Sequence, residues 1–186
     1  MKTNIIPAFR LTLVMLLLCS GLYTMMVYAA AQIVPGGGHG VKVSSKGKTW
    51  YANIGQQFTD DRYFQGRPSA VQYNASASGG SNKGPYDHEY VDTVRARIET
   101  FLQHNPTVKK SEIPVALVTA SGSGLDPDIS PEAALVQVNR VAAIRKLDPA
   151  KLRTLIIRQT HQPLWDFMGP QKINVLQLNI ALDKLN

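Results

Sequence analysis

The chain has 186 residues, with 20 Lys and Arg against 13 Asp and Glu, and therefore a formal net charge of +7. This length allows one packed domain, and the single cysteine, Cys19, excludes an intramolecular disulfide. The basic residues form no cluster interleaved with aromatic side chains, which argues against nucleic acid as a partner. Anionic lipid headgroups or an acidic protein surface remain as partners for this charge.

Residues 11–31, from Leu11 to Ala31, form an apolar run without a charge. As a helix rising about 1.5 Å per residue, the run is about 30 Å long, which matches the hydrocarbon core of a bilayer. The sequence therefore predicts one transmembrane helix. The alternative is a cleaved signal peptide, with cleavage after the alanines that end the run. Since apolar regions of signal peptides span about 7 to 15 residues, the length favours an uncleaved helix.

Charges on the two sides of the run indicate its orientation. Arg10 lies directly before it, whereas the first lysine after it, Lys42, follows a glycine-rich segment. We therefore expect residues 1–10 in the cytoplasm and the chain beyond residue 31 on the other side of the membrane. Without Lys2 and Arg10, that exported part has 18 basic and 13 acidic residues, a net charge of +5.

Residues 32–48 are predicted to form a linker and the first strand region, before an extracytoplasmic α+β domain over residues 49–186. The glycines between Gln32 and Gly40 do not match the spacing of a phosphate-binding loop, so they indicate a flexible linker. Alternating residues on either side of Lys46–Lys48 then predict a hairpin. Further on, Arg67 has two interpretations, either pairing with a carboxylate or phosphate or bonding nearby carbonyls in a turn.

Periodicity and capping residues predict three helices and two strands in the domain. The first helix starts near Tyr86 and ends before Pro106, where proline cannot continue it. Two others begin with a capping residue followed by proline, at Ser130–Pro131 and Asp148–Pro149. The expected elements are helices over 86–105, 131–146 and from 149, a buried strand over 112–119 and a final strand over 173–178.

Two loops rich in serine and glycine, residues 75–85 and 120–131, are the candidate sites. The second lies between an expected strand and an expected helix, where backbone N–H groups can face an anion. Ser121 or Ser123 as a nucleophile would need a base, but no histidine is near and the spacing of a nucleophile elbow is absent. We therefore expect no catalytic residue. The four histidines are too widely spaced to indicate a metal site.

Several motifs in order resemble the C subunit of the bacterial potassium-transporting P-type ATPase, the Kdp system. The resemblance covers nearly the whole chain, including the single membrane helix, and departs from the usual pattern at Lys83 and Asp128. It rests on Gly55–Gln56, Tyr63–Phe64, Gly66–Ala70, Ser78–Asn82, Val118–Pro127, Ile129–Pro131, Gln137, Arg140–Ala142, Asn174–Leu176, Leu178–Asn179 and Ala181–Asp183.

The resemblance implies an accessory subunit of the high-affinity, ATP-driven potassium uptake complex in the bacterial inner membrane. Its partners would be the potassium-translocating A subunit, the ATP-hydrolysing B subunit, the small F subunit and membrane lipid. It would be needed for assembly and activity, and would act as a catalytic chaperone that raises the ATP affinity of the B subunit. No cofactor would bind tightly, and ATP would be contacted only in the complex. The competing hypothesis is a signal-peptide-bearing periplasmic enzyme resembling a serine hydrolase.

Within these motifs, fifteen residues are candidates for contact with a partner or a nucleotide. They are Arg67, Pro68, Ser69, Ser78, Gly79, Gly80, Ser81, Asn82, Ser121, Gly122, Ser123, Gly124, Asp126, Gln137 and Arg140. Because ATP is cytoplasmic and these loops are expected outside, we expect any effect on ATP affinity to pass through the partner subunits.

Overall fold

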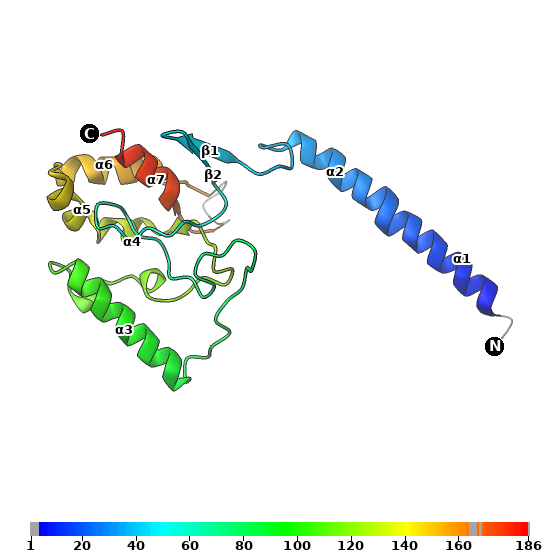
Figure 1. Cartoon of the computed structure of the whole chain (residues 1–186), viewed down its shortest axis with the longest axis horizontal. Coiled ribbons are helices and arrows are strands. Elements are labelled where there is room, and N and C mark those ends of the chain that lie inside the picture. The colour runs from blue at the N-terminus through cyan, green and yellow to red at the C-terminus, as the bar shows by residue number, and fades with distance from the viewer. Residues whose placement is uncertain (1–3, 164–166, 168, 186) are drawn as a thin grey trace. The chain divides into compact units, whose positions relative to one another are not determined.

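A computed structural model describes residues 4–163, 167 and 169–185 (Figure 1). It divides the chain into two units, Met1–Lys42 and Val43–Asn186, which are described separately below. The sequence also predicts an aromatic-rich loop over residues 163–170, of which 164–166 and 168 lie outside the described residues. Helices and short strands are both present, which confirms the mixed α and β class.

The first unit is one long apolar helix that begins at Ile5 and ends at Ile33. It consists of α1 (Ile5–Leu16), a π-helical turn (Leu17–Leu22) and α2 (Tyr23–Ile33), and none of these buries a residue. With 29 residues, the helix is long and apolar enough to span a membrane. Beyond it, Gly36 has φ +90, and a Cβ there would lie 2.7 Å from the Gly40 carbonyl oxygen, so the turn requires glycine.

The second unit opens with the predicted hairpin. Strand β1 (Lys42–Ser45) pairs with β2 (Lys48–Tyr51), and Lys46 and Gly47 make the turn, both with positive φ. A second pair of very short antiparallel strands, β3 (Asp128–Ile129) and β4 (Ile173–Asn174), joins distant parts of the chain.

The described part of the second unit contains five α-helices: α3 (His88–His104), α4 (Pro131–Leu135), α5 (Val138–Arg145), α6 (Pro149–Gln159) and α7 (Val175–Leu182). The two predicted caps are confirmed. Ser130 Oγ accepts from the Ala133 N–H at 3.2 Å, and the Asp148 carboxylate accepts from the Ala150 N–H at 2.8 Å. Both bonds satisfy donors that a helix start leaves free.

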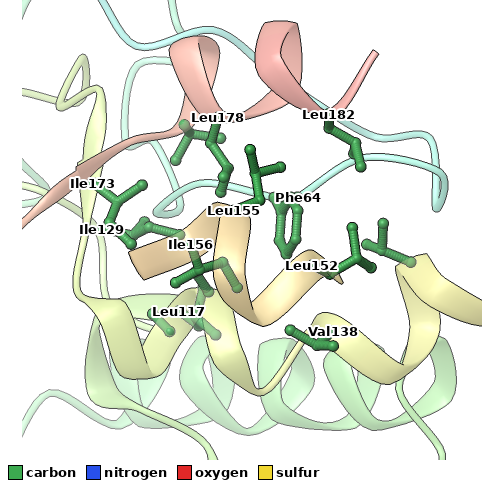
Figure 2. Close-up of a cluster of buried hydrophobic side chains, with 14 of the residues drawn as sticks. Phe64, Leu117, Ile129, Val138, Leu152, Leu155, Ile156, Ile173, Leu178 and Leu182 are labelled. Atoms are coloured by element: carbon green, nitrogen blue, oxygen red, sulfur yellow. The ribbon is translucent and has the colours of Figure 1, made fainter. Parts of the chain in front are cut away.

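The hydrophobic core lies between α4, α5, α6 and α7, and Phe64 from an irregular segment inserts into it (Figure 2). Phe64, Leu152, Leu178 and Leu182 are each 0 % exposed. Helix α3 lies on the far side of α4 and α5 from α7 in both views (Figures 1 and 2). It buries only Phe101, so it contributes little to this core.

Both long predicted strands are wrong. Residues 112–119 contain a 3₁₀ turn, Val115–Leu117, because Pro114 cannot donate to a ladder and none of the strands in the described ranges pairs with this run. At residues 173–178 only Ile173 and Asn174 are extended. The Asn174 side chain then accepts from the Gln177 N–H at 3.0 Å and caps α7, so the apolar run that follows becomes a helix buried on several sides.

The single helix predicted over residues 131–146 is also wrong, because it breaks between α4 and α5. In a continuous helix the Gln137 N–H would donate to the Ala133 carbonyl. Instead the Gln137 side chain donates to that carbonyl through Nε2 at 2.9 Å, and the Gln137 N–H donates to Ala134 O at 3.1 Å. The side chain thus takes a backbone acceptor and divides the helix.

Candidate functional site

Three of the motif segments meet in space and form what we call the loop cluster, residues 66–73, 78–80 and 120–126. Ser69 Oγ donates to Gly124 O at 2.6 Å. The Gly79 N–H and the Ser78 hydroxyl both donate to Ser123 O, at 2.9 and 3.0 Å. The Ser121 N–H donates to Pro68 O at 3.3 Å. The glycine- and serine-rich loops are therefore held in shape by bonds to each other's backbone.

Glycines allow these loops to approach so closely. Gly124 has φ +66, and a Cβ there would lie 2.6 Å from Val71 Cγ2 and 2.8 Å from Gly79 O. A Cβ on Gly80 would lie 3.0 Å from Gly122 O. Since real Cβ atoms do not tolerate contacts under about 3 Å, side chains at these places would force the loops apart.

Arg67 and Asp126 form the ion pair of the loop cluster. Arg67 Nη1 lies 3.0 Å from Asp126 Oδ2, which confirms pairing with a carboxylate. Nη2 donates to Ala120 O at 3.4 Å, but Ala120 lies 53 residues away in sequence, so this bond is not the local turn of the second interpretation. The other carboxylate oxygen of Asp126 accepts from the Asp128 N–H at 3.0 Å, which makes Asp126 a turn-stabilising carboxylate. Arg67 Nε is buried without a hydrogen-bond partner among the described residues.

The two serines considered as nucleophiles have no catalytic environment. Ser121 is 2 % exposed, and its hydroxyl has no partner within the described ranges. Ser123 is exposed, and its hydroxyl accepts from the Leu125 N–H at 3.1 Å. Neither hydroxyl bonds to a histidine in the described part of the chain. The hypothesis of a serine hydrolase therefore gains no support.

Two other candidates, Ser81 and Asn82, lie on the exposed loop that leads to α3, and Asn82 has φ 52. Among residues 4–163, 167 and 169–185, no group of three His, Cys, Asp or Glu side chains is placed to hold a metal ion.

Gln137 lies apart from the loop cluster and is completely buried. Its Oε1 accepts from the Gln65 N–H at 2.8 Å, and its Nε2 donates to Gln65 O at 3.1 Å. The Asn179 side chain binds Phe64, the residue before Gln65, in the same way. It accepts from the Phe64 N–H and donates to Phe64 O, both at 2.9 Å. The two amides thus supply the hydrogen bonds that a neighbouring strand would give to an extended segment.

Arg140 completes this arrangement and is 7 % exposed. Its Nη1 donates to Tyr63 O at 3.1 Å and also to the Asp61 carbonyl, while Nη2 donates to Gln137 Oε1 at 2.7 Å. Nε donates to Asn105 Oδ1 at 3.0 Å. Burial lowers the pKa of the guanidinium, and the Asp61 carboxylate at 3.4 Å opposes that shift. Arg140 thus fixes the segment that carries Phe64 into the core.

Of the residues that bind the Phe64 segment, Gln137 and Arg140 were among the candidates, but Asn179 was not. Asn105, which accepts a hydrogen bond from Arg140, was also missed. Asn179 is 2 % exposed and Asn105 is 1 % exposed. A polar residue within the apolar run Val175–Leu182 was the available signal, since a buried amide needs partners. The partners themselves lie 115 residues away from Asn179 and could not be identified from spacing.

Comparison with known proteins places this arrangement in a family. Residues 5–184 match the family model described as KdpC: K+-transporting ATPase, c chain. A protein from Flavobacterium johnsoniae named potassium-transporting ATPase KdpC subunit is 47 % identical over 183 residues, which cover 98 % of each chain. Proteins of the same name from Bacteroides fragilis and Bacillus cereus are 44 and 42 % identical, covering 100 and 96 % of this chain and 98 and 94 % of theirs. The chain therefore belongs to the KdpC family, the C chains of K+-transporting ATPases.

Proposed function

We propose that the chain is the accessory subunit of an ATP-driven potassium uptake complex. The observation that carries this proposal is the family match over residues 5–184. The described structure agrees with it, because the motif residues stabilise loops and a buried segment instead of forming a reactive centre.

The partners in this proposal are the potassium-translocating subunit, the ATP-hydrolysing subunit and the small single-helix subunit. Within its own unit, the apolar helix Ile5–Ile33 buries none of its residues, so it offers apolar surface to lipid and to helices of the partners. Residues 1–10 would be cytoplasmic, and the domain beyond the helix would cap the potassium-translocating subunit on the outer face of the inner membrane.

The first experiment removes the chain from the complex. With this chain tagged at Asn186, we expect the partner subunits to co-purify from membranes. Membranes that lack the chain should lose potassium-stimulated ATP hydrolysis, and adding back the full chain should restore it. Activity that persists fully without the chain would refute the accessory role.

The orientation is tested by protease protection in sealed right-side-out vesicles, using the same tag. We expect external protease to remove the tag, which would exclude direct contact of the domain with cytoplasmic ATP. A tag protected until the vesicles are opened would place the domain inside and make the serine- and glycine-rich loops candidates for a nucleotide site.

The chaperone effect on ATP is proposed to pass through the partner subunits. The complex with the chain should then show a lower KM for ATP than the complex without it. The isolated full chain in detergent should bind no ATP in equilibrium dialysis. Binding of ATP by the isolated chain would contradict indirect action.

A further inference from the structure

A groove lies along α3 and shares residues 66–68 and 73 with the loop cluster. Its volume is about 610 Å³, and its lining comes from α3, from residues 57–59, 65–68 and 73, and from Leu117. On α3 the lining runs from Thr93 to His104, which is about 16 Å along a helix axis. An extended polypeptide rising about 3.3 Å per residue would place about five residues along that length.

The lining contains two guanidinium groups, of Arg67 and Arg97, the imidazole of His104 and no acidic side chain. Two of these groups have a carboxylate nearby, since Arg67 pairs with Asp126 and His104 Nδ1 lies 2.9 Å from Asp61 Oδ2. Arg97 is different. Its Nη1 donates to Val118 O at 3.1 Å, and it takes part in no ion pair among the residues that the structure describes.

The backbone of residues 118–120 brings the two guanidinium groups to one part of the groove. Arg97 bonds to Val118 O, and Arg67 bonds to Ala120 O two residues further on. Arg67 also keeps Nε buried without a partner among the described residues. Two partly exposed guanidiniums fixed in this way create a positive end that attracts a carboxylate.

The remainder of the groove favours close contact with a polypeptide. The residues that α3 contributes at its exposed surface, Thr93, Ala96 and Thr100, are small and allow a backbone to approach. Phe58, which is partly exposed, adds apolar surface. Helix α3 buries only Phe101, whereas α5, α6 and α7 each bury three or more residues, so a larger share of α3 is left for a partner.

We propose that this α3 groove binds an extended, acidic segment of a partner subunit, with a carboxylate of that segment at Arg97. The proposal rests on the proposed function, because it names the contact surface through which the accessory subunit is held. Charge complementarity favours an acidic partner segment. Arg97 takes part in no ion pair among the described residues, and the groove lining contains no acidic side chain that could neutralise it.

The test titrates full-length chain into partner complex that lacks it and follows the recovery of potassium-stimulated ATP hydrolysis. Arg97→Glu reverses the charge in the groove, and Ala96→Trp fills it. Each should raise the concentration for half recovery by about tenfold or more, as for a buried contact at an interface. Arg95→Glu makes the same charge change on the same helix outside the groove lining, and Ala143→Trp adds the same bulk on α5. Both controls should stay within about twofold.

The outcomes separate the two proposals. If the unmodified chain restores no activity, the accessory function itself fails. If it restores activity and Arg97→Glu and Ala96→Trp titrate like their controls, the groove proposal is overturned. Far-UV circular dichroism during heating checks that each variant is folded.

A second measurement covers a variant that does not fold. A photo-crosslinking amino acid at position 96, compared with one at position 143, should join a partner segment containing Asp or Glu in the assembled complex. Crosslinks from position 96 only to lipid, to this chain or to a segment without acidic residues would overturn the proposal.

Discussion

Replacing Asn179 by leucine tests whether side chains really substitute for a strand at the Phe64 segment. Leucine has the same branching as asparagine and is larger, so Asn179→Leu leaves no cavity but removes both hydrogen bonds to Phe64. Those bonds join Asn179 Oδ1 to the Phe64 N–H and Asn179 Nδ2 to Phe64 O, each at 2.9 Å. Phe64 is 0 % exposed, so water does not reach its backbone N–H and carbonyl.

The expected cost follows from the groups left without partners. An unsatisfied buried donor or acceptor costs about 1–3 kcal/mol. Two such groups, with part of the cost relieved when the segment relaxes, give a loss of about 3–4 kcal/mol in the free energy of unfolding. For a protein of about 10 kcal/mol, the middle of the typical range, this loss is about a third of the stability.

Urea unfolding of the full chain in detergent, followed by far-UV circular dichroism, measures this change. Gln177→Leu on the same helix is the matched control. Gln177 is partly exposed, so that change should stay within about 0.5 kcal/mol. If Asn179→Leu were no more destabilising than Gln177→Leu, the amide pairing would carry no stability and the reasoning would be refuted.

Three further changes test other parts of the fold. Gly124→Ala should lower stability by more than about 2 kcal/mol, because its Cβ would lie 2.6 Å from Val71 Cγ2 and the residue would keep a positive φ. Gly122→Ala is the control: a Cβ there meets open space, so its thermal melting should stay near that of the unmodified chain. Ser130→Ala should cost about 1 kcal/mol by removing the cap of α4, and urea unfolding that shows no loss would contradict the cap. Burial raises the pKa of Asp183, but hydrogen bonds from Lys46 and Arg145 lower it more, leaving it below 3.8. Its contribution is therefore present above that value and lost as pH falls through the folded pKa, so Asp183→Asn should flatten the acid limb of a stability-against-pH curve.

Local signals in the sequence determined much of this protein. The apolar run, the hairpin turn and the capped helix starts at Ser130 and Asp148 depend on residues within a few positions of one another, and the structure has them where they were predicted. The motif order was enough to indicate the KdpC family, which the match over residues 5–184 confirms. Arg67 left two interpretations; its pairing with a carboxylate is present, whereas the carbonyl that it bonds lies 53 residues away in sequence and not in a local turn.

Tertiary structure decided whatever depended on distant partners. The composition of residues 173–178 predicted a strand. In the described part of the chain no strand pairs with residues 175–178, and the Asn174 side chain caps them as the start of α7. The expected helix over residues 131–146 breaks at Gln137, whose side chain bonds both the Ala133 carbonyl and the backbone of Gln65, 72 residues earlier in the chain. A buried side-chain amide requires hydrogen-bond partners, and these can come from any part of the chain that the fold places beside it. Sequence spacing therefore does not identify them. For the same reason only the folded chain brings Arg97 and Arg67 together along α3.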